Sequence, residues 1–198
     1  MNTDKEIVEL SRSDPAIFGE LYDRHAPDIY RYAARRAGDF AAEDVMAETF
    51  LIAFERRASF SGQAEAVRPW LFGIAANLLR RHHRAEARML RALAKDGRRG
   101  DCADRLEAVD AKVDADGDRF RMGAALQALA PIDREAILLY AWADLTYDGI
   151  ATATGVPIGT VRSRINRARR KLRADLGFAL FDEMDSDHGR TAPAPRNA

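Results

Sequence analysis

A short basic segment near the C-terminus holds the side chains best suited to reading a nucleic acid. Residues 155–173 read GVPIGTVRSRINRARRKLR, with seven Arg or Lys and no acid from Arg162 onward. Arg can bond guanine bidentately and Asn can bond adenine, whereas the remaining cations suit phosphates. The candidates for these contacts are Thr160, Arg162, Ser163, Asn166, Arg167 and Arg170.

The apolar residues of this segment predict the helix that positions those side chains. Their spacing of four, three and four residues describes one buried face, with every cation on the other faces: Val161, Ile165, Ala168 and Leu172. Thr146 is a suitable N-cap for a short preceding helix, Gly155 supplies a left-handed turn, and Pro157 starts the next helix. This pattern predicts a helix-turn-helix that enters a DNA major groove. The alternative is a solvated basic helix of an ordinary bundle.

A second polar stripe lies on a predicted helix that runs from Trp70 to Arg84. Its members sit at offsets of zero, three, four and seven, which is one continuous face: Asn77, Arg80, Arg81 and Arg84. The loop before this helix contains Phe60 and Ser61. Phe60 could stack on an unpaired base or simply anchor the loop, and Trp70 could be ordinary core.

The sequence offers little support for a metal site or for catalysis. His82 and His83 are adjacent, so they point about 100° apart on a helix, and we find no carboxylate spaced to assist them. The sequence has no Gly-rich phosphate loop and no activated-serine motif. We therefore expect no metal site, no cofactor and no enzymatic activity.

An acidic helix is predicted around residues 43–54, which read EDVMAETFLIAF. Glu43, Asp44 and Glu48 lie beside a strongly apolar body that includes Phe50. Taken alone, this segment is a surface helix with one buried face.

The overall composition is that of a globular protein whose charges are segregated along the chain. The 198 residues are 47% hydrophobic and 31% charged, and the formal net charge is zero. Residues 1–50 hold eleven acids against six bases, whereas residues 56–98 hold ten bases against three acids. A polyanion would therefore be gripped in two places. The single Cys102, the polar N-terminus and the lack of a membrane-length apolar run predict a cytoplasmic protein without membrane insertion.

Helical periodicity without strand-like alternation predicts an all-α fold of two small domains joined by a flexible linker. Several helices are expected from Pro15 to about Arg91, with a polar break at residues 39–43, and a second set from about Phe120. The second domain is expected to be of a four-helix type. The predicted boundaries are 1–94, a linker at 95–118, 119–177, and a disordered tail at 178–198.

Two groups of segments together resemble the extracytoplasmic-function (ECF) sigma factors of bacterial RNA polymerase. The first group is FGELYDRHAPDIYRYAARR, AEDVMAETFLIAF and RPWLFGIAANLLRRHHR, and the second is ALAPIDREAILLYAWADLTYDGIATATGVPIGTVRSRINRARRKLR. Their order, the acidic-then-basic layout and the linker also fit this family. The rival hypothesis is a stand-alone helix-turn-helix regulator whose first domain serves for oligomerisation.

The resemblance implies a role for each matching segment. The segment with Glu43, Asp44, Glu48 and Phe50 would dock on the clamp helices of the polymerase largest subunit, and the second domain would meet the flap of the second largest. The loop at 59–67 and the helix at 70–84 would read and melt the minus-ten element, and the helix at 158–173 would read the minus-thirty-five element. An anti-sigma factor is a further expected partner.

Three positions depart from the common pattern of the family. Gly149 lies inside the first helix of the helix-turn-helix, where a glycine costs about 0.5–1 kcal/mol. Arg81 and Ala76 stand where many members carry Asp and Arg, respectively. The acidic tail lies outside the resemblance and is either a disordered end or a regulator-binding extension.

Overall fold

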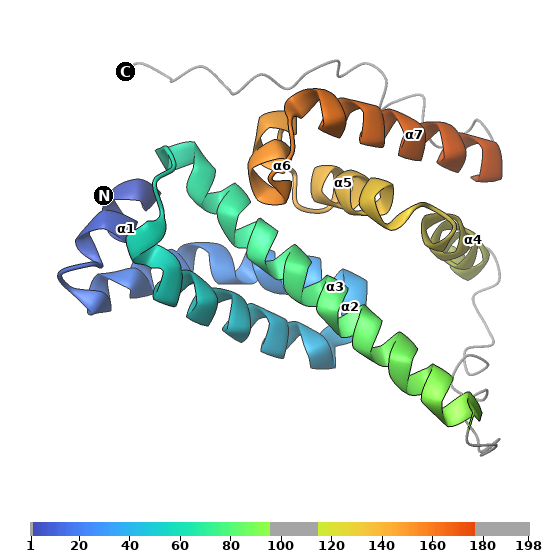
Figure 1. Cartoon of the computed structure of the whole chain (residues 1–198), viewed down its shortest axis with the longest axis horizontal. Helices are drawn as coiled ribbons and strands as arrows, with labels where there is room; N and C mark the ends of the chain where they lie inside the picture. Colours follow the sequence, from blue (N-terminus) through green and yellow to red (C-terminus); the bar gives the residue numbers. More distant parts are fainter. Residues whose placement is uncertain (1, 96–114, 177–198) are drawn as a thin grey trace.

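The computed structural model describes residues 2–95 and 115–176, and all regular structure in these two ranges is helical. Figure 1 shows α1–α3 on one side and α4–α7 on the other. The prediction of an all-α fold is confirmed. The elements are α1 (Asp4–Leu10), α2 (Gly19–Arg56), α3 (Val67–Lys95), α4 (Ala115–Gln127), α5 (Pro131–Ala141), α6 (Tyr147–Thr154) and α7 (Ile158–Leu176), with short 3-10 turns at Pro15–Phe18, Arg57–Ser59 and Ala64–Ala66.

Helix α1 was not anticipated from the sequence, although its start carries a readable signal. The Thr3 side chain accepts from the Glu6 backbone N–H while the Glu6 side chain accepts from that of Thr3, which is a capping box. Ile7 and Val8 are then fully buried in the core. The short polar N-terminus therefore forms a helix, because the reciprocal Thr3–Glu6 hydrogen bonds satisfy backbone N–H groups of its first turn.

Helix α2 is two antiparallel arms joined at Gly38. This glycine has φ 79° and ψ 164°, a conformation that other residues strongly disfavour. Beyond it the chain folds back, so that the Tyr22 ring packs 4.9 Å from that of Phe50. The predicted break is thus confirmed, but it falls one residue earlier than expected, and residues 39–43 are themselves helical.

Helix α3 packs along both arms of α2 and completes the N-terminal core. Leu71, Ala75 and Leu79 are fully buried, and the Phe72 ring meets Tyr32 edge-on at 5.3 Å. The helix begins at Val67, two residues before the Pro69 that was expected near its start. Proline is tolerated there because the first helical turn has no intrahelical partner for its N–H.

Helices α6 and α7 form the predicted helix-turn-helix. The Thr146 side chain accepts from the Gly149 N–H at 3.1 Å, and Gly155 is left-handed with φ 66°. The expected buried face of α7 is confirmed in full: Val161, Ile165, Ala168 and Leu172. Helix α4 begins at Ala115, earlier than the expected start near Phe120, so it takes up the end of the predicted linker. Most of that linker and the tail at 178–198 lie outside the described residues.

The two halves of the chain also pack directly on each other, which the sequence did not indicate. Helix α6 lies against α3, as Figure 1 shows, and one continuous cluster of buried residues includes both halves. Gly149 lies at this contact, because a Cβ there would come within 3.2 Å of Pro69 Cγ. Tertiary packing therefore accounts for a glycine that helix propensity alone disfavours.

Candidate nucleic-acid interface

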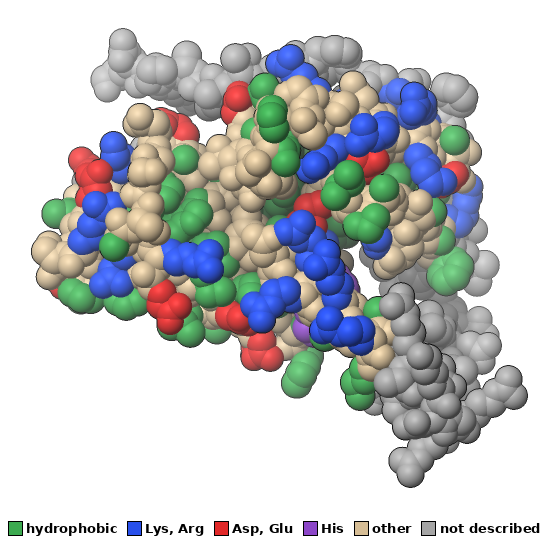
Figure 2. All heavy atoms as spheres, in the orientation of Figure 1, with side chains coloured by type: hydrophobic (Ala, Val, Ile, Leu, Met, Phe, Trp, Pro, Cys, Tyr) green, Lys and Arg blue, Asp and Glu red, His purple; other side chains and the backbone are tan. Residues whose placement is uncertain are grey.

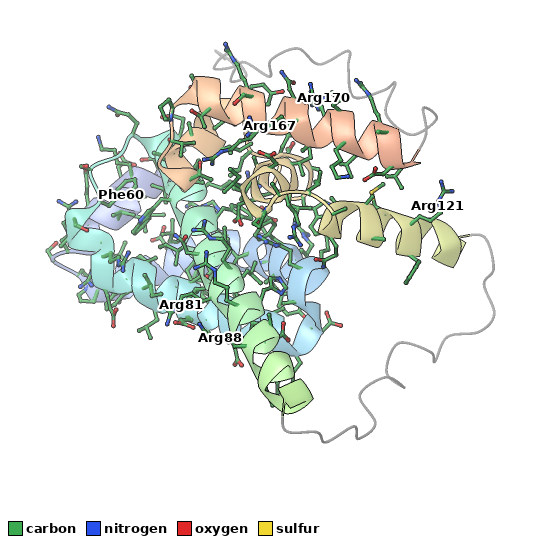
Figure 3. The ribbon with its side chains drawn as sticks, turned by 45° about the vertical axis from the view of Figure 1, so that its right-hand side comes forward. Phe60, Arg81, Arg88, Arg121, Arg167 and Arg170 are labelled. Atoms are coloured by element: carbon green, nitrogen blue, oxygen red, sulfur yellow. The ribbon has the colours of Figure 1, made fainter. Side chains whose placement is uncertain are left out.

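Helix α7 presents an exposed row of polar side chains on the face opposite its buried stripe. Figure 2 shows Lys and Arg side chains gathered along α7 and along the C-terminal half of α3. Figure 3 shows Arg167 and Arg170 on α7. Thr160 is half-buried, and the other predicted contacts are exposed: Arg162, Ser163, Asn166, Arg167 and Arg170.

One cation of α7 contradicts the expectation that all of them face outward. Arg169 is only 9% exposed, and its guanidinium lies 5.1 Å from the centre of the Tyr140 ring. Its position explains this burial, because it follows Ile165 by four residues and so shares the buried stripe. Nε and Nη2 of Arg169 have no hydrogen-bond partner among the described residues. Its charge is stabilised by the aromatic face instead.

Arg167 is held in place by a carboxylate of α5. Its Nε and Nη2 donate to the two oxygens of Asp133 at 3.0 and 2.8 Å. This hydrogen bond raises the pKa of Arg167 above its ordinary value. Asp133 is buried, whereas the Arg167 side chain stays 47% exposed. The pair therefore orients Arg167 without removing it from the surface.

The basic stripe predicted on α3 is present and exposed. Asn77, Arg80, Arg81 and Arg84 are all exposed. Arg80 donates to the Asn77 side-chain oxygen, and Arg81 forms a long ion pair of 4.0 Å with Glu48 of α2. Arg88 continues the same row one turn beyond Arg84, and Figure 3 shows it following Arg81 along α3. Arg88 follows Arg84 by four residues, and this spacing could have identified it from the sequence.

The loop before α3 is closed by an aromatic pair. The Phe60 and Trp70 rings lie 4.9 Å apart, and the Phe60 carbonyl accepts from Arg12 at 2.8 Å. Both rings are half-buried, whereas Ser61 is exposed. Of the two alternatives left open for Phe60, this packing corresponds to the loop anchor.

An open groove of about 760 Å³ separates the two arms of α2. Its lining combines aromatic, apolar and mostly acidic side chains with one arginine: Tyr22, Asp23, Tyr30, Arg31, Glu43, Asp44 and Met46. Glu48 is exposed nearby, but Phe50 is only 5% exposed because its ring packs under Tyr22. Three of the four residues predicted to bind a partner on this helix are therefore accessible, and Phe50 supports them from below.

The expectation that His82 and His83 have no carboxylate near them is wrong. Glu86 brings a carboxylate oxygen within 3.4 Å of His82 Nδ1 and 3.5 Å of His83 Nδ1. Glu86 follows His82 by four residues and His83 by three, so the three side chains are neighbours on one helix surface. Burial and the charge of Arg36 lower the pKa of His83. The same positive surroundings oppose a bound cation, so we assign no metal to the cluster.

A capped helix-turn-helix and a second basic helix, both exposed, define a bipartite DNA-binding protein. The chain matches the Sigma-70 region 2 family over residues 21–89 and the Sigma-70 region 4 family over residues 119–172. It is 33% identical to the ECF RNA polymerase sigma factor SigL of Mycobacterium tuberculosis over 165 residues, which are 83% of this chain and 91% of that protein.

Solved structures show the same fold. CnrH, bound to the cytosolic domain of CnrY, is similar with a TM-score of 0.60 and 25% identity, over 94% of this chain and 99% of that one. The sigma factor RpoE of Bartonella quintana, bound to the anti-sigma factor NepR, gives a TM-score of 0.54 and 26% identity, over 80% and 96% of the two chains.

The chain belongs to the ECF RNA polymerase sigma factors. It binds core RNA polymerase and directs promoter-specific initiation of transcription. The alternative of a stand-alone regulator is not favoured, since the N-terminal half matches region 2. None of the described helices is long and apolar enough to cross a membrane.

Proposed function

We propose that α7 reads the minus-thirty-five element as duplex DNA. The observation that carries this assignment is the exposed polar face of α7 directly after a capped α6 and the left-handed Gly155. A recognition helix in this arrangement lies in the major groove and uses its outward side chains for base edges. Arg162, Ser163, Asn166 and Arg167 take that role, with Thr160 and Arg170 on the backbone.

The basic face of α3 serves the minus-ten element in the same proposal. Asn77, Arg80, Arg81 and Arg84 form one exposed stripe that can follow a phosphate backbone. Ser61 lies exposed in the loop that Phe60 and Trp70 anchor. Binding an unstacked base requires cations along the backbone and an aromatic ring for stacking. The α3 stripe supplies the cations, and Phe60 of the loop supplies the ring. Phe60 reaches such a base only if it turns away from Trp70.

Core polymerase binds the acidic side of α2. Glu43 and Asp44 line the open groove between the arms, and Glu48 is exposed on the same helix. Acidic rims around an apolar floor suit a partner with basic and apolar side chains. We assign this groove to the clamp helices of the largest subunit and the C-terminal half to the flap of the second largest.

The domain boundaries follow from these assignments. Residues 1–94 carry core binding and the minus-ten element, and residues 119–177 carry the minus-thirty-five element. Residues 95–118 connect them, and residues 178–198 form the tail. The two family matches lie inside the first and second of these domains.

A regulator and a compartment complete the proposal. CnrH is solved with the cytosolic domain of CnrY, and RpoE is solved with the anti-sigma factor NepR. We infer from these complexes that this chain also has an anti-sigma partner. Its work on core polymerase takes place in the cytoplasm. Phosphodiester synthesis belongs to polymerase, so the chain itself acts as a specificity subunit rather than an enzyme.

Reconstitution with core polymerase tests these roles. The full chain is mixed with core enzyme, bound promoter DNA is selected from a random library, and the selected DNA is transcribed. We expect the selected DNA to contain two enriched elements, one at minus-ten and one at minus-thirty-five. We also expect transcripts that appear only when core enzyme is present. A single enriched element, or transcripts that do not change when either element is mutated, would contradict the bipartite assignment.

A further inference from the structure

Helix α1 lies against the loop that precedes α3. Figure 1 shows α1 beside this loop, and α1 contacts the two 3-10 turns that flank it, Arg57–Ser59 and Ala64–Ala66. Ile7 and Val8 of α1 are fully buried, so α1 is a fixed part of the N-terminal core. Helix α1 carries none of the proposed DNA or polymerase contacts, yet it touches the loop at both of its ends.

Two arginines join the turn after α1 to the start of the loop, and they do so in opposite directions. Arg12 of the turn donates from Nη2 to the Phe60 carbonyl oxygen at 2.8 Å. Arg57 of the loop donates from Nε to the Ser11 carbonyl oxygen at 3.1 Å. The donor in both bonds is charged, which makes such bonds stronger than those between neutral groups. The backbone from residue 57 to residue 60 is therefore held at both ends.

The two arginines differ in what else they contact. Arg57 is half-buried, its guanidinium lies 3.8 Å from the centre of the Phe54 ring, and Nη1 donates to the Phe54 carbonyl at 2.6 Å. Arg12 is exposed, and within the described residues the Phe60 carbonyl is the one hydrogen-bond partner of its side chain. Arg57 thus stabilises the core as well as the loop, whereas Arg12 acts on the loop alone.

The ring of Phe60 is enclosed by its own loop and by α3. It lies 4.9 Å from the Trp70 ring, and a Cβ built on Gly62 would come within 2.7 Å of Phe60 Cζ. The loop can therefore close over the ring because residue 62 has no side chain. Since Arg12 holds the Phe60 carbonyl, the ring can leave Trp70 by rotation about its own side-chain bonds while the loop backbone stays in place.

We propose that Arg12 is a positioning residue for capture of the unstacked minus-ten base, because it fixes the backbone from which the Phe60 ring turns. The inference rests on the assignment of this loop and α3 to the minus-ten element. A loop that is ordered before binding loses less conformational freedom when the base is bound, so the base is held more tightly. Arg12 touches no base in this role.

Arg12→Ala in the full chain, bound to core polymerase, tests this role, with Arg35→Ala as the matched control. Both arginines are exposed, and Arg35 lies on the first arm of α2. The holoenzyme is titrated with single-stranded oligonucleotides of the selected minus-ten element, in which each base is replaced in turn. We expect Arg12→Ala to bind the unaltered oligonucleotide about 3- to 10-fold less tightly, with the loss concentrated at one base position. Arg35→Ala should match the parent chain.

Rescue and salt dependence separate positioning from a direct contact between Arg12 and a phosphate. Arg12→Lys keeps a charged donor for the Phe60 carbonyl, so it should recover most of the lost affinity. A lost phosphate contact would weaken every oligonucleotide alike and reduce the slope of binding against salt by about 0.7. A positioning role leaves that slope unchanged. Urea unfolding of the free chain should give the parent midpoint for Arg12→Ala, because its side chain is exposed.

Four results would overturn the proposal. They are equal binding of Arg12→Ala and the parent, uniform weakening with a smaller salt slope, uniform weakening with a lower urea midpoint, and an Arg35→Ala variant that behaves like Arg12→Ala. Failure of the underlying assignment has a different signature. A parent holoenzyme that does not discriminate among the minus-ten oligonucleotides would contradict the role of the loop itself, and the inference about Arg12 with it.

Discussion

Asp133 accepts two hydrogen bonds from Arg167, at 3.0 Å from Nε and 2.8 Å from Nη2, and so fixes the direction of this exposed arginine of α7. A guanidinium has five N–H donors, and this pairing uses two of them along one edge. The opposite edge, with both Nη1 protons, remains free for a guanine or a phosphate. If α7 reads DNA as proposed, the buried carboxylate acts through Arg167 and touches no base itself.

Asp133→Asn is expected to weaken promoter recognition at one position of the minus-thirty-five element. An amide offers one acceptor instead of two, so the Arg167 side chain loses its fixed orientation. We expect a loss of about 1–3 kcal/mol in discrimination at that base pair, measured by duplex binding with each base substituted. Asp148→Asn is the matched control, because Asp148 is also an acid in the first turn of its helix and is exposed. Equal effects from the two changes would mean that charge alone is responsible.

Arg167→Ala and Arg170→Ala should separate base reading from phosphate binding. In the proposed role, Arg167 contacts a base, so the penalty for its loss should fall on one position of the duplex, at about 1–3 kcal/mol. Loss of Arg170 should weaken all sequences alike and reduce the slope of binding against salt by about one. The same duplex panel at several salt concentrations measures both. Uniform weakening by Arg167→Ala would assign Arg167 to phosphate.

The double change Asp44→Asn with Glu48→Gln should weaken core binding without altering minus-thirty-five duplex binding. Both acids are exposed on the second arm of α2, and Asp44 lines the groove. We expect an affinity loss of about 5- to 30-fold for core, in the range of 1–2 kcal/mol for rim charges. Glu20→Gln with Glu55→Gln removes the same charge from the same helix and serves as the control. A parallel loss of minus-thirty-five duplex binding would indicate unfolding instead.

Asp4→Asn should destabilise the protein at neutral pH but not at acid pH. Burial opposes ionisation of Asp4, but hydrogen bonds and charges from His25 and Arg24 outweigh it and lower its pKa. Because the folded-state pKa is depressed, this stabilisation is complete above the unfolded value of about 4 and is lost as pH falls through the folded value.

Urea unfolding at a series of pH values measures the effect of Asp4→Asn. We expect the variant to lose about 1–3 kcal/mol at pH 7, since two charge-assisted bonds of 2.5 Å are removed. The two proteins should converge below pH 4. Asp23→Asn, an exposed acid on α2, should leave the curve unchanged. A constant difference at every pH would show that Asp4 acts through packing rather than charge.

The local features of this chain were readable from its sequence because they depend on neighbours within one or two turns. The cap at Thr146, the left-handed Gly155 and the buried face of α7 each follow from spacing and residue type. The basic stripe on α3 is exposed for the same reason. Periodicity also predicted the all-helical fold, and the resemblance of the quoted segments, in their order, indicated the family. Helix α1 was missed even though its capping box was present in the letters.

Tertiary structure decided what depends on residues far apart in the chain. No spacing rule places Asp133 against Arg167, brings Glu135 to Arg36, or seats Ala153 on Gly73, because these partners lie 34 to 99 residues apart. Burial of Phe50 likewise depends on the Tyr22 ring of the other arm of α2, which packs over it. The sequence by itself therefore determined which surfaces carry charge, and three-dimensional packing determined which of those charges are held, buried or free to bind DNA.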